Sequence, residues 1–428
     1  QSRRVEPLEK SPKAIFAAMR GASSGLKLSP SYNLLPLDVP VDVDMEYAEV
    51  RGLKGKRMSR IIFGTLFLSK AEDPLSLLDA VRQTGCNAFD CAAIYGGGEC
   101  ERLLGHWLRE RKVERDDVIL ITKGGCHGQD KLWAADLEPT SVARHLAKSL
   151  ETMGVSYVDL YLLHRDDPTK PVSDIVDMMH ELQLQGRYTA WGVSNWGLSR
   201  LQAAIAYAES VGKAGPVCDS PQMSLAQPAR PVWPQTKYYT PASSPVYLAK
   251  DVAVLGWEVL AKGFMTGKWD RSDGARAQQM QQQIETDPSV AAELGPAGER
   301  AAEWRELQLT TAYCIEDNFL RRERAQELAE KKGLSLAQIA LKYVASQPFN
   351  GFVLVGTTSA KHFGENSIGG STNKLTPQEV RWLETGEMSE GGTSSLDGIG
   401  EAPEAVINSP PGGKRKRDQS PEELVPMF

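Results

Sequence analysis

Short apolar runs alternate with helical stretches along most of this chain, and this alternation constrains the fold more than any other feature. The candidate strands cover residues 60–64, 87–89, 118–123, 158–164, 188–194, 217–221, 252–260 and 352–355. Candidate helices lie between them, at 74–84, 99–111, after Pro139, and at 172–185, 198–211 and 335–346. Strand–helix alternation predicts a parallel sheet, and eight units predict a closed (β/α)8 TIM barrel, an α/β fold.

Length and charge exclude several classes of protein. A barrel with insertions accommodates 428 residues, and 41% hydrophobic with 24% charged residues is ordinary for a globular chain. The net charge of −6 argues against nucleic-acid binding, and no apolar run is long enough to span a membrane. The six cysteines form no C-x-x-C pair, so neither a metal site nor a disulfide framework is expected.

The chain is predicted to form one domain with two extensions. Residues 1–45 have a basic excess and no clear period, which predicts a flexible N-terminal arm; the alternative is a trimmed organelle transit segment. A cytoplasmic location is therefore expected, with an organelle as the alternative. The barrel covers residues 46–388 and contains an insertion, 271–312, read as either a lid or a disordered segment.

Residues 389–428 are rich in Gly, Ser and Pro and are predicted to be a disordered tail. The basic run from Lys414 to Arg417 is either a nuclear-import signal or a solvated part of that tail, and the second reading is favoured.

Polar side chains follow the apolar runs at three successive predicted strand ends. These are Asp90, Lys123 and His164, with Tyr95 five residues after Asp90. Alone, these residues could be a helix cap, a solvated strand end and a hydrogen-bonded core histidine. Because the carboxyl ends of barrel strands meet at one mouth, their coincidence instead predicts an active site there.

The chemistry of this set suits proton donation to an alkoxide as it forms. A phenol has a pKa of about 10, and a neighbouring ammonium lowers it by stabilising the phenolate. Lys123 can be that ammonium for Tyr95, Asp90 can keep Lys123 charged and in place, and His164 can hydrogen-bond a carbonyl oxygen.

An ordered set of motifs over residues 50–382 resembles the aldo-keto reductases, a family of NAD(P)H-dependent carbonyl reductases built on this barrel. The motifs are Phe89-Asp90, Tyr95-Gly96 with Glu99, Thr122-Lys123, the run from Asp159 to His164, the run from Gly192 to Asn195, Gln222, the run from Ala261 to Phe264, and Glu365-Asn366. The resemblance implies reduction of an aldehyde or ketone, with Asp90, Tyr95, Lys123 and His164 as catalytic residues and Tyr95 as the general acid.

The resemblance also implies a nicotinamide cofactor, NADPH with NADH as an alternative. Ser194, Asn195 and Gln222 would bind the carboxamide, Trp257 would stack on the nicotinamide, and residues 259–264 and 356–366 would wrap the pyrophosphate and ribose. The full implied set is Thr65, Asp90, Ser194, Asn195, Gln222, Trp257, Leu260, Lys262, Gly263, Gly356, Thr357, Thr358, His362, Glu365 and Asn366. Where the family often has an arginine or lysine, this chain has Thr357, Thr358 and Ser359, which leaves the cofactor preference open.

The sequence also allows a second function, other than catalysis. Some proteins of this family act as cofactor-sensing regulatory subunits with little turnover, and they keep the same site residues. The insertion and tails show no apolar heptad that would dock a partner, so the enzyme with a small-molecule carbonyl substrate is favoured; the oligomeric state is left open.

Arg165, which follows His164, is expected either to recognise a carboxylate on the substrate or to pair with Asp166 or Asp167. Trp133, Trp196 and Trp233 are candidates to line the substrate pocket.

Overall fold

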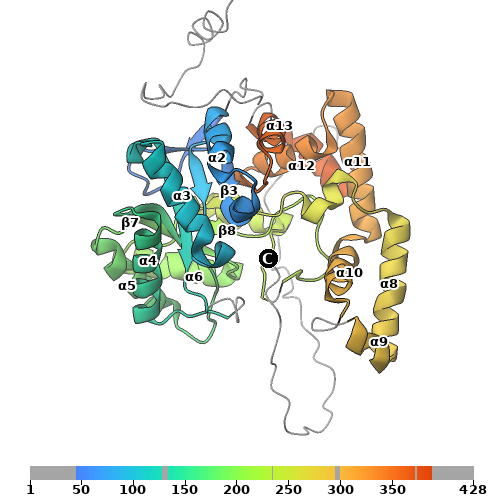
Figure 1. The fold of residues 1–428 in the computed structure, drawn as a ribbon, viewed down its shortest axis with the longest axis horizontal. Coiled ribbons are helices and arrows are strands. Elements are labelled where there is room, and N and C mark those ends of the chain that lie inside the picture. The colour runs from blue at the N-terminus through green and yellow to red at the C-terminus, as the bar shows by residue number, and fades with distance from the viewer. Residues whose placement is uncertain (1–44, 128–133, 234, 295–298, 372–373, 388–428) are drawn as a thin grey trace, which may run out of the picture.

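The computed structural model describes residues 45–127, 134–233, 235–294, 299–371 and 374–387. Within these ranges eight parallel strands form a closed barrel, and each strand pairs with the next one in the chain before β10 closes onto β3 (Figure 1). The predicted TIM barrel is confirmed. The strands are β3 (Ile61–Gly64), β4 (Ala88–Asp90), β5 (Ile119–Gly124), β6 (Val158–Leu163), β7 (Tyr188–Ser194), β8 (Cys218–Ser220), β9 (Ala253–Gly256) and β10 (Gly351–Val355).

Helices surround this barrel, and neighbours along the ring pack on one another, as α3 does on α4 and α5 on α6 (Figure 1). They are α2 (Pro74–Gln83), α3 (Glu99–Glu110), α4 (Pro139–Met153), α5 (Val172–Leu184), α6 (Leu198–Val211), α7 (Ser244–Lys250), α11 (Glu316–Lys332), α12 (Leu336–Ala345), α13 (Ala360–Ser371) and α14 (Pro377–Thr385). None of the helices in the described ranges combines the length and the apolar composition needed to cross a bilayer.

The strands are buried on both faces, and successive side chains point in opposite directions. On β5, Ile119 and Ile121 join the apolar cluster inside the barrel, whereas Leu120 joins the cluster between the barrel and the helices. This explains why the strands read as continuous apolar runs, which is typical of parallel sheets covered on both sides.

An antiparallel hairpin precedes the barrel and closes its N-terminal end. It consists of β1 (Tyr47–Glu49) and β2 (Arg57–Ser59). Val50, Leu53 and Met58 from the hairpin pack with the residues inside the barrel. This hairpin was not predicted from the sequence, because its strands have only three residues each.

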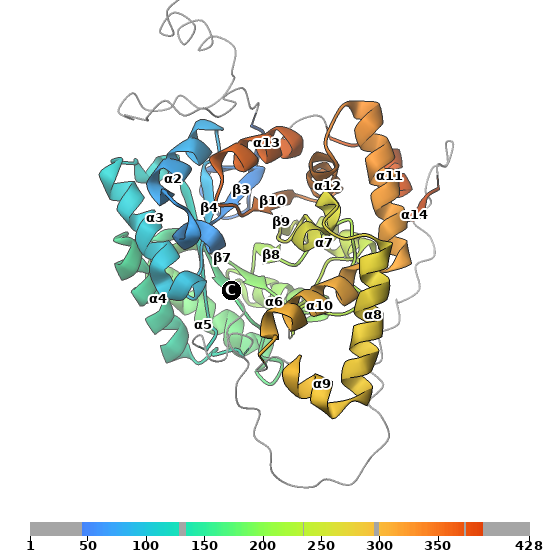
Figure 2. The ribbon, with the colours of Figure 1, turned by 45° about the vertical axis from the view of Figure 1, so that its right-hand side comes forward.

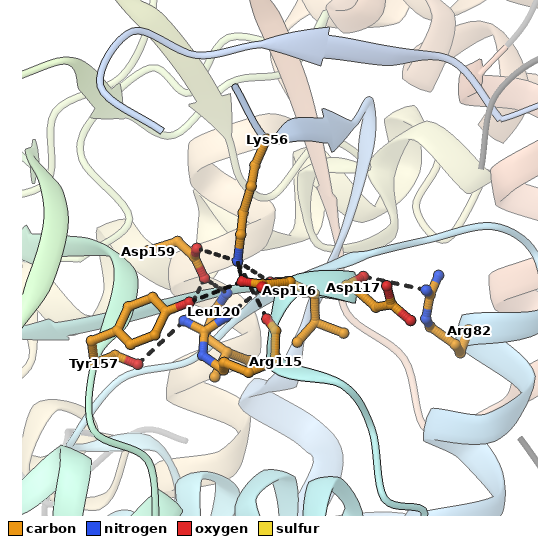
Figure 3. Close-up of polar contacts among 9 residues, drawn as sticks. Lys56, Arg82, Arg115, Asp116, Asp117, Leu120, Tyr157 and Asp159 are labelled. Atoms are coloured by element: carbon orange, nitrogen blue, oxygen red, sulfur yellow. Dashed lines mark hydrogen bonds and ion pairs between the residues drawn. The ribbon is translucent and has the colours of Figure 1, made fainter. Parts of the chain in front are cut away.

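A charged cluster holds the same end of the barrel together. Figure 3 shows Asp159 between Lys56 and Arg115. Its Oδ1 lies 3.0 Å from Lys56 Nζ and its Oδ2 lies 2.6 Å from an Arg115 guanidinium nitrogen, while the backbone N–H of Leu120 donates to Oδ2 at 2.8 Å. The Arg115 guanidinium also lies over the Tyr157 ring, 4.1 Å from its centroid. The cluster therefore ties the hairpin to the starts of β5 and β6.

Two features differ from the sequence-based expectation. The seventh strand was predicted over 252–260, but β9 ends at Gly256, because the chain turns through left-handed conformations at Glu258 and Ala261. Apolar residues on both sides of Glu258 follow the true strand end, and including them in the strand made the predicted boundary wrong.

The insertion is helical over its described residues, so the reading of 271–312 as disordered is wrong there. It forms α8 (Arg271–Thr286), α9 (Pro288–Glu293) and α10 (Ala301–Tyr313), which stand beside the barrel in Figure 2. Asp270 caps α8 through a capping box with Asp273. Ala277, Leu294 and Leu307 form a small apolar core of their own between these helices.

Candidate active site

A cavity of about 920 Å³ opens at the carboxyl ends of the barrel strands. Asp90, Tyr95, Lys123 and His164 all line it, although they come from three separate strands and the loops that follow them. Backbone hydrogen bonds continue past the strand ends, from Ala93 N–H to Lys123 O at 3.1 Å and from His164 N–H to Gly124 O at 2.8 Å. Because the pairing continues past the strand ends, the segments that carry these four side chains lie side by side at the cavity.

The lysine connects the acid and the phenol. Lys123 Nζ lies 2.5 Å from Asp90 Oδ2, and it donates to Tyr95 Oη at 3.2 Å and to the Cys91 carbonyl at 2.9 Å. The Tyr95 and His164 rings are in an edge-to-face arrangement, with centroids 6.0 Å apart. Immediately after Tyr95, Gly96 and Gly97 adopt left-handed conformations, at φ 57° and 66°, which turn the chain sharply towards α3.

The ion pair is buried, and its charges depend on each other. Burial by itself would lower the pKa of the Lys123 ammonium, but Asp90 and Tyr95 reverse this and hold the pKa above its ordinary value. Burial raises the pKa of Asp90, and the attraction of Lys123 opposes that rise. Lys123 is therefore a fixed cation beside the phenol.

The phenol stays protonated at neutral pH. Burial raises the pKa of Tyr95 to about 12, because it outweighs the stabilisation of the phenolate by Lys123. The sequence-based expectation that Lys123 would lower this pKa below 10 is wrong for the protein without ligand, since it left out the cost of burying the phenolate. The pKa of His164 is well below its ordinary value because of burial and the nearby cations Lys123 and Arg165, so its imidazole is neutral.

Three polar residues next to this group have the character of an amide-binding site. Ser194 ends β7, and Asn195 follows it in a left-handed conformation, φ 62°, which asparagine tolerates well. Asn195 donates to the His164 carbonyl at 3.1 Å. Among the described residues, the buried carbonyl oxygens Asn195 Oδ1 and Gln222 Oε1 have no hydrogen-bond partner. An N–H group of a nicotinamide carboxamide is a suitable donor for Asn195 Oδ1, because Ser194 and Asn195 line the cavity, whereas Gln222 does not. Ser194 and Asn195 therefore fit this group.

The loop after β9 lines the next part of the cavity. Trp257, Leu260, Lys262 and Gly263, all implied by the resemblance, are in its wall. The Trp257 indole N–H donates to the Ser220 carbonyl at 2.9 Å, which fixes the ring. The 3-10 helix η6 (Ala261–Thr266) follows and begins with left-handed residues.

The segment after β10 contributes less to the wall than the resemblance implied. Gly356 and Asn366 line the cavity, but Thr357, Thr358, His362 and Glu365 are not part of its lining. His362 is exposed, and the exposed Glu365 lies 3.8 Å from Lys361. Gln222 and Thr65 are buried behind the wall, and Thr65 donates to the Asp90 carbonyl at 3.0 Å.

The predicted substrate-pocket residues, three tryptophans and Arg165, do not all line the cavity. Trp233 and Arg165 line the cavity. Trp196 is buried behind it and donates to the Arg165 carbonyl at 3.3 Å, and Trp133 lies outside the described residues. Asp166 pairs with Arg200 at 2.8 Å, and Asp167 accepts from Thr169.

Other lining residues were missed from the sequence. Glu258 and Arg230 line the cavity, as do Trp304 and Gln308 of α10, so the insertion forms part of the wall. Only folding brings α10 to the barrel, and no motif marks these positions. Among the described residues, no group of three or more His, Cys, Asp and Glu could hold a metal ion.

Comparison with known proteins places this site in a family. The sequence profile of the Aldo/keto reductase family matches residues 60–385. A probable voltage-gated potassium channel subunit beta from Oryza sativa subsp. japonica is 26% identical over 75% of this chain and 90% of its own length. The aldo-keto reductase str7 from Strobilurus tenacellus is 26% identical over 72% of this chain and 79% of its own length. A putative voltage-gated potassium channel subunit beta from Schizosaccharomyces pombe is 25% identical over 70% and 80%. The match over most of the barrel supports an oxidoreductase, and the chain belongs to the Aldo/keto reductase family.

Proposed function

We propose that this protein reduces an aldehyde or ketone to an alcohol, with Tyr95 as the general acid and NADPH as the preferred cofactor. The observation that carries the proposal is the contact of one buried ammonium, Lys123 Nζ, with both Asp90 and the Tyr95 hydroxyl at the wall of a large cavity.

A bound nicotinamide cofactor would supply a hydride to the carbonyl carbon, and proteins of this family typically use such cofactors. Tyr95 donates its hydroxyl proton to the carbonyl oxygen as that oxygen gains negative charge. Lys123 stabilises the phenolate that remains, and Asp90 keeps the ammonium charged and in place. Neutral His164 donates a ring N–H to the same oxygen, which orients the carbonyl towards Tyr95.

The preference for NADPH depends on cations near the 2′-phosphate. The segment after β10 offers the exposed Lys361 and His362, whereas Lys262 lies on the separate loop after β9. Lysine binds phosphate as a point charge without the bidentate geometry of arginine, so discrimination against NADH should be modest. Dissociation constants for the two cofactors, measured by cofactor fluorescence, test this preference.

The regulatory alternative draws support from the similarity to proteins named as potassium channel subunits beta. It predicts tight cofactor binding with little turnover. The distinguishing experiment follows the consumption of NADPH with a panel of aliphatic, aromatic and acidic aldehydes and ketones. We expect at least one class to be reduced at an ordinary enzymatic rate of about 1 s⁻¹ or more. Cofactor binding without turnover on any class would favour the regulatory reading.

We also propose a cytoplasmic location. All six cysteines are buried free thiols, which is typical of proteins in a reducing compartment. Cell fractionation of the full chain tests this.

A further inference from the structure

Glu258, in the loop after β9, forms an ion pair with one residue and accepts hydrogen bonds from three others. Its Oε1 lies 2.6 Å from Lys262 Nζ and 3.2 Å from the Trp233 indole nitrogen. Its Oε2 accepts from Gln222 Nε2 at 3.0 Å and from the Tyr313 hydroxyl at 3.4 Å. Its side chain is only 11% exposed, yet Glu258, Lys262 and Trp233 all line the cavity. These four partners hold the carboxylate in a defined position in the cavity wall.

The position of this ion pair coincides with the usual phosphate site of such barrels. TIM barrels frequently bind a phosphate with the loops after the seventh and eighth strands. Here those strands are β9 and β10, and the loops contribute Lys262 with Gly263 and Gly356 to the cavity. Lys262, 24% exposed, is the cation on the first of these loops that a phosphate in the cavity would meet.

Without a ligand, however, the ammonium of Lys262 already has a partner. A phosphate that binds Lys262 must draw it from Glu258, and the carboxylate that remains repels the incoming negative charge. The exchange leaves no bare buried charge, because Trp233, Gln222 and Tyr313 continue to donate to Glu258. The wall is therefore arranged so that Lys262 can change partners.

We propose that Glu258 competes with the cofactor phosphates for Lys262, and that it thereby sets the affinity and the release of the dinucleotide. Glu258 is in this sense a positioning residue: it acts through Lys262. The inference rests on the proposed function in that it requires a nicotinamide dinucleotide in the cavity, but it does not require that carbonyl reduction occurs.

The test is a double-mutant cycle on cofactor binding. Glu258→Gln removes the charge and keeps the shape of the side chain. Its single amide oxygen can replace either Oε1, which accepts from Trp233, or Oε2, which accepts from Gln222 and Tyr313. We expect it to bind NADPH about fivefold more tightly, the size of effect expected for a partly exposed ion pair. The affinity of the variant for ADP, which has the pyrophosphate but no nicotinamide, should rise by a similar factor. The affinity of the variant should also fall more steeply with added salt, because Lys262 then faces the phosphate alone.

Lys262→Met is the matched control. It should weaken the binding of both ligands, and Glu258→Gln should produce no gain in the Lys262→Met background. Thermal unfolding of each variant checks that the fold is retained, and the dissociation rate of NADPH by stopped flow should fall in Glu258→Gln.

Three results would overturn the inference. Glu258→Gln could leave the affinities for NADPH and ADP unchanged or weaken them, which would mean that Glu258 only holds the wall together. Its gain could persist in the Lys262→Met background, which would exclude competition for Lys262. If the wild-type protein bound NADPH and the variants did not differ, only this inference would fail; if it bound no NADPH, the proposed function would fail with it.

Discussion

Lys123 Nζ lies 3.2 Å from the Tyr95 hydroxyl oxygen and 4.8 Å from the centroid of the Tyr95 ring. In this position the ammonium can donate to the phenol and stabilise the phenolate that proton transfer leaves. Asp90, whose Oδ2 lies 2.5 Å from the same ammonium, prevents burial from discharging the lysine.

The first prediction concerns this ammonium. Lys123→Met should lower kcat by a factor of about 10²–10⁴, because Tyr95 loses the cation that stabilises its phenolate. It also leaves Asp90 as a buried carboxylate without its partner, which destabilises the fold. The double variant Lys123→Met with Asp90→Asn is therefore the control: it should recover stability, measured by urea unfolding, but not activity. Recovery of activity in the double variant would show that the loss came from the fold.

The second prediction concerns Arg165, which lines the cavity beside His164 and affects its pKa. If the guanidinium recognises a carboxylate on the substrate, Arg165→Met should lower kcat/KM for an acidic aldehyde by about tenfold or more. A neutral aldehyde of the same size should be affected by less than about twofold. Arg165→Lys should recover part of the loss only, since lysine lacks the bidentate geometry. Equal losses on both substrates would reject substrate recognition.

The third prediction is a dependence of stability on pH. Asp219 on β8 is buried, and burial raises its pKa to about 7, with one oxygen accepting from the Tyr247 hydroxyl at 2.8 Å. A carboxyl with a raised folded-state pKa stabilises the fold fully below its unfolded pKa of about 3.9, and this stabilisation is lost as the pH rises through about 7. This contribution to the unfolding free energy should therefore fall by up to about 4 kcal/mol between acidic and mildly alkaline pH. Asp219→Asn should remove that dependence, and an unchanged pH profile in the variant would contradict the assignment.

The fourth prediction concerns the charged cluster at the N-terminal end of the barrel. Asp159→Ala should destabilise the protein by about 3 kcal/mol, because it leaves two cations and the Leu120 N–H without their shared acceptor (Figure 3). Lys56→Met should cost less, about 1 kcal/mol, since Lys56 is partly exposed and Arg115 remains. Urea unfolding measures both, and a smaller effect for Asp159→Ala than for Lys56→Met would be inconsistent with a shared acceptor.

The sequence predicted the barrel and the placement of the four catalytic candidates because both depend on local signals. Apolar runs mark buried strands, and a polar residue at the end of such a run marks the mouth, as Asp90, Lys123 and His164 do. The end of β9 was misplaced because the predicted strand was continued through Gly256 and Glu258 to the apolar residues beyond them, whereas the backbone turns at Glu258. Glu258 and Trp304 were missed because their roles depend on contacts between segments distant in sequence, such as that of Glu258 with Tyr313. The pKa of Tyr95 was misjudged for a similar reason, since burial is a property of the folded chain.

The most direct test of the central claim compares Tyr95→Phe with the wild-type protein in two assays, turnover of a reducible aldehyde and fluorescence titration of NADPH. If Tyr95 is the general acid, the variant should lose a factor of about 10²–10⁴ in kcat, while the dissociation constant of NADPH changes by less than about threefold. A variant that retains most of the wild-type rate, with its cofactor affinity intact, would contradict the account.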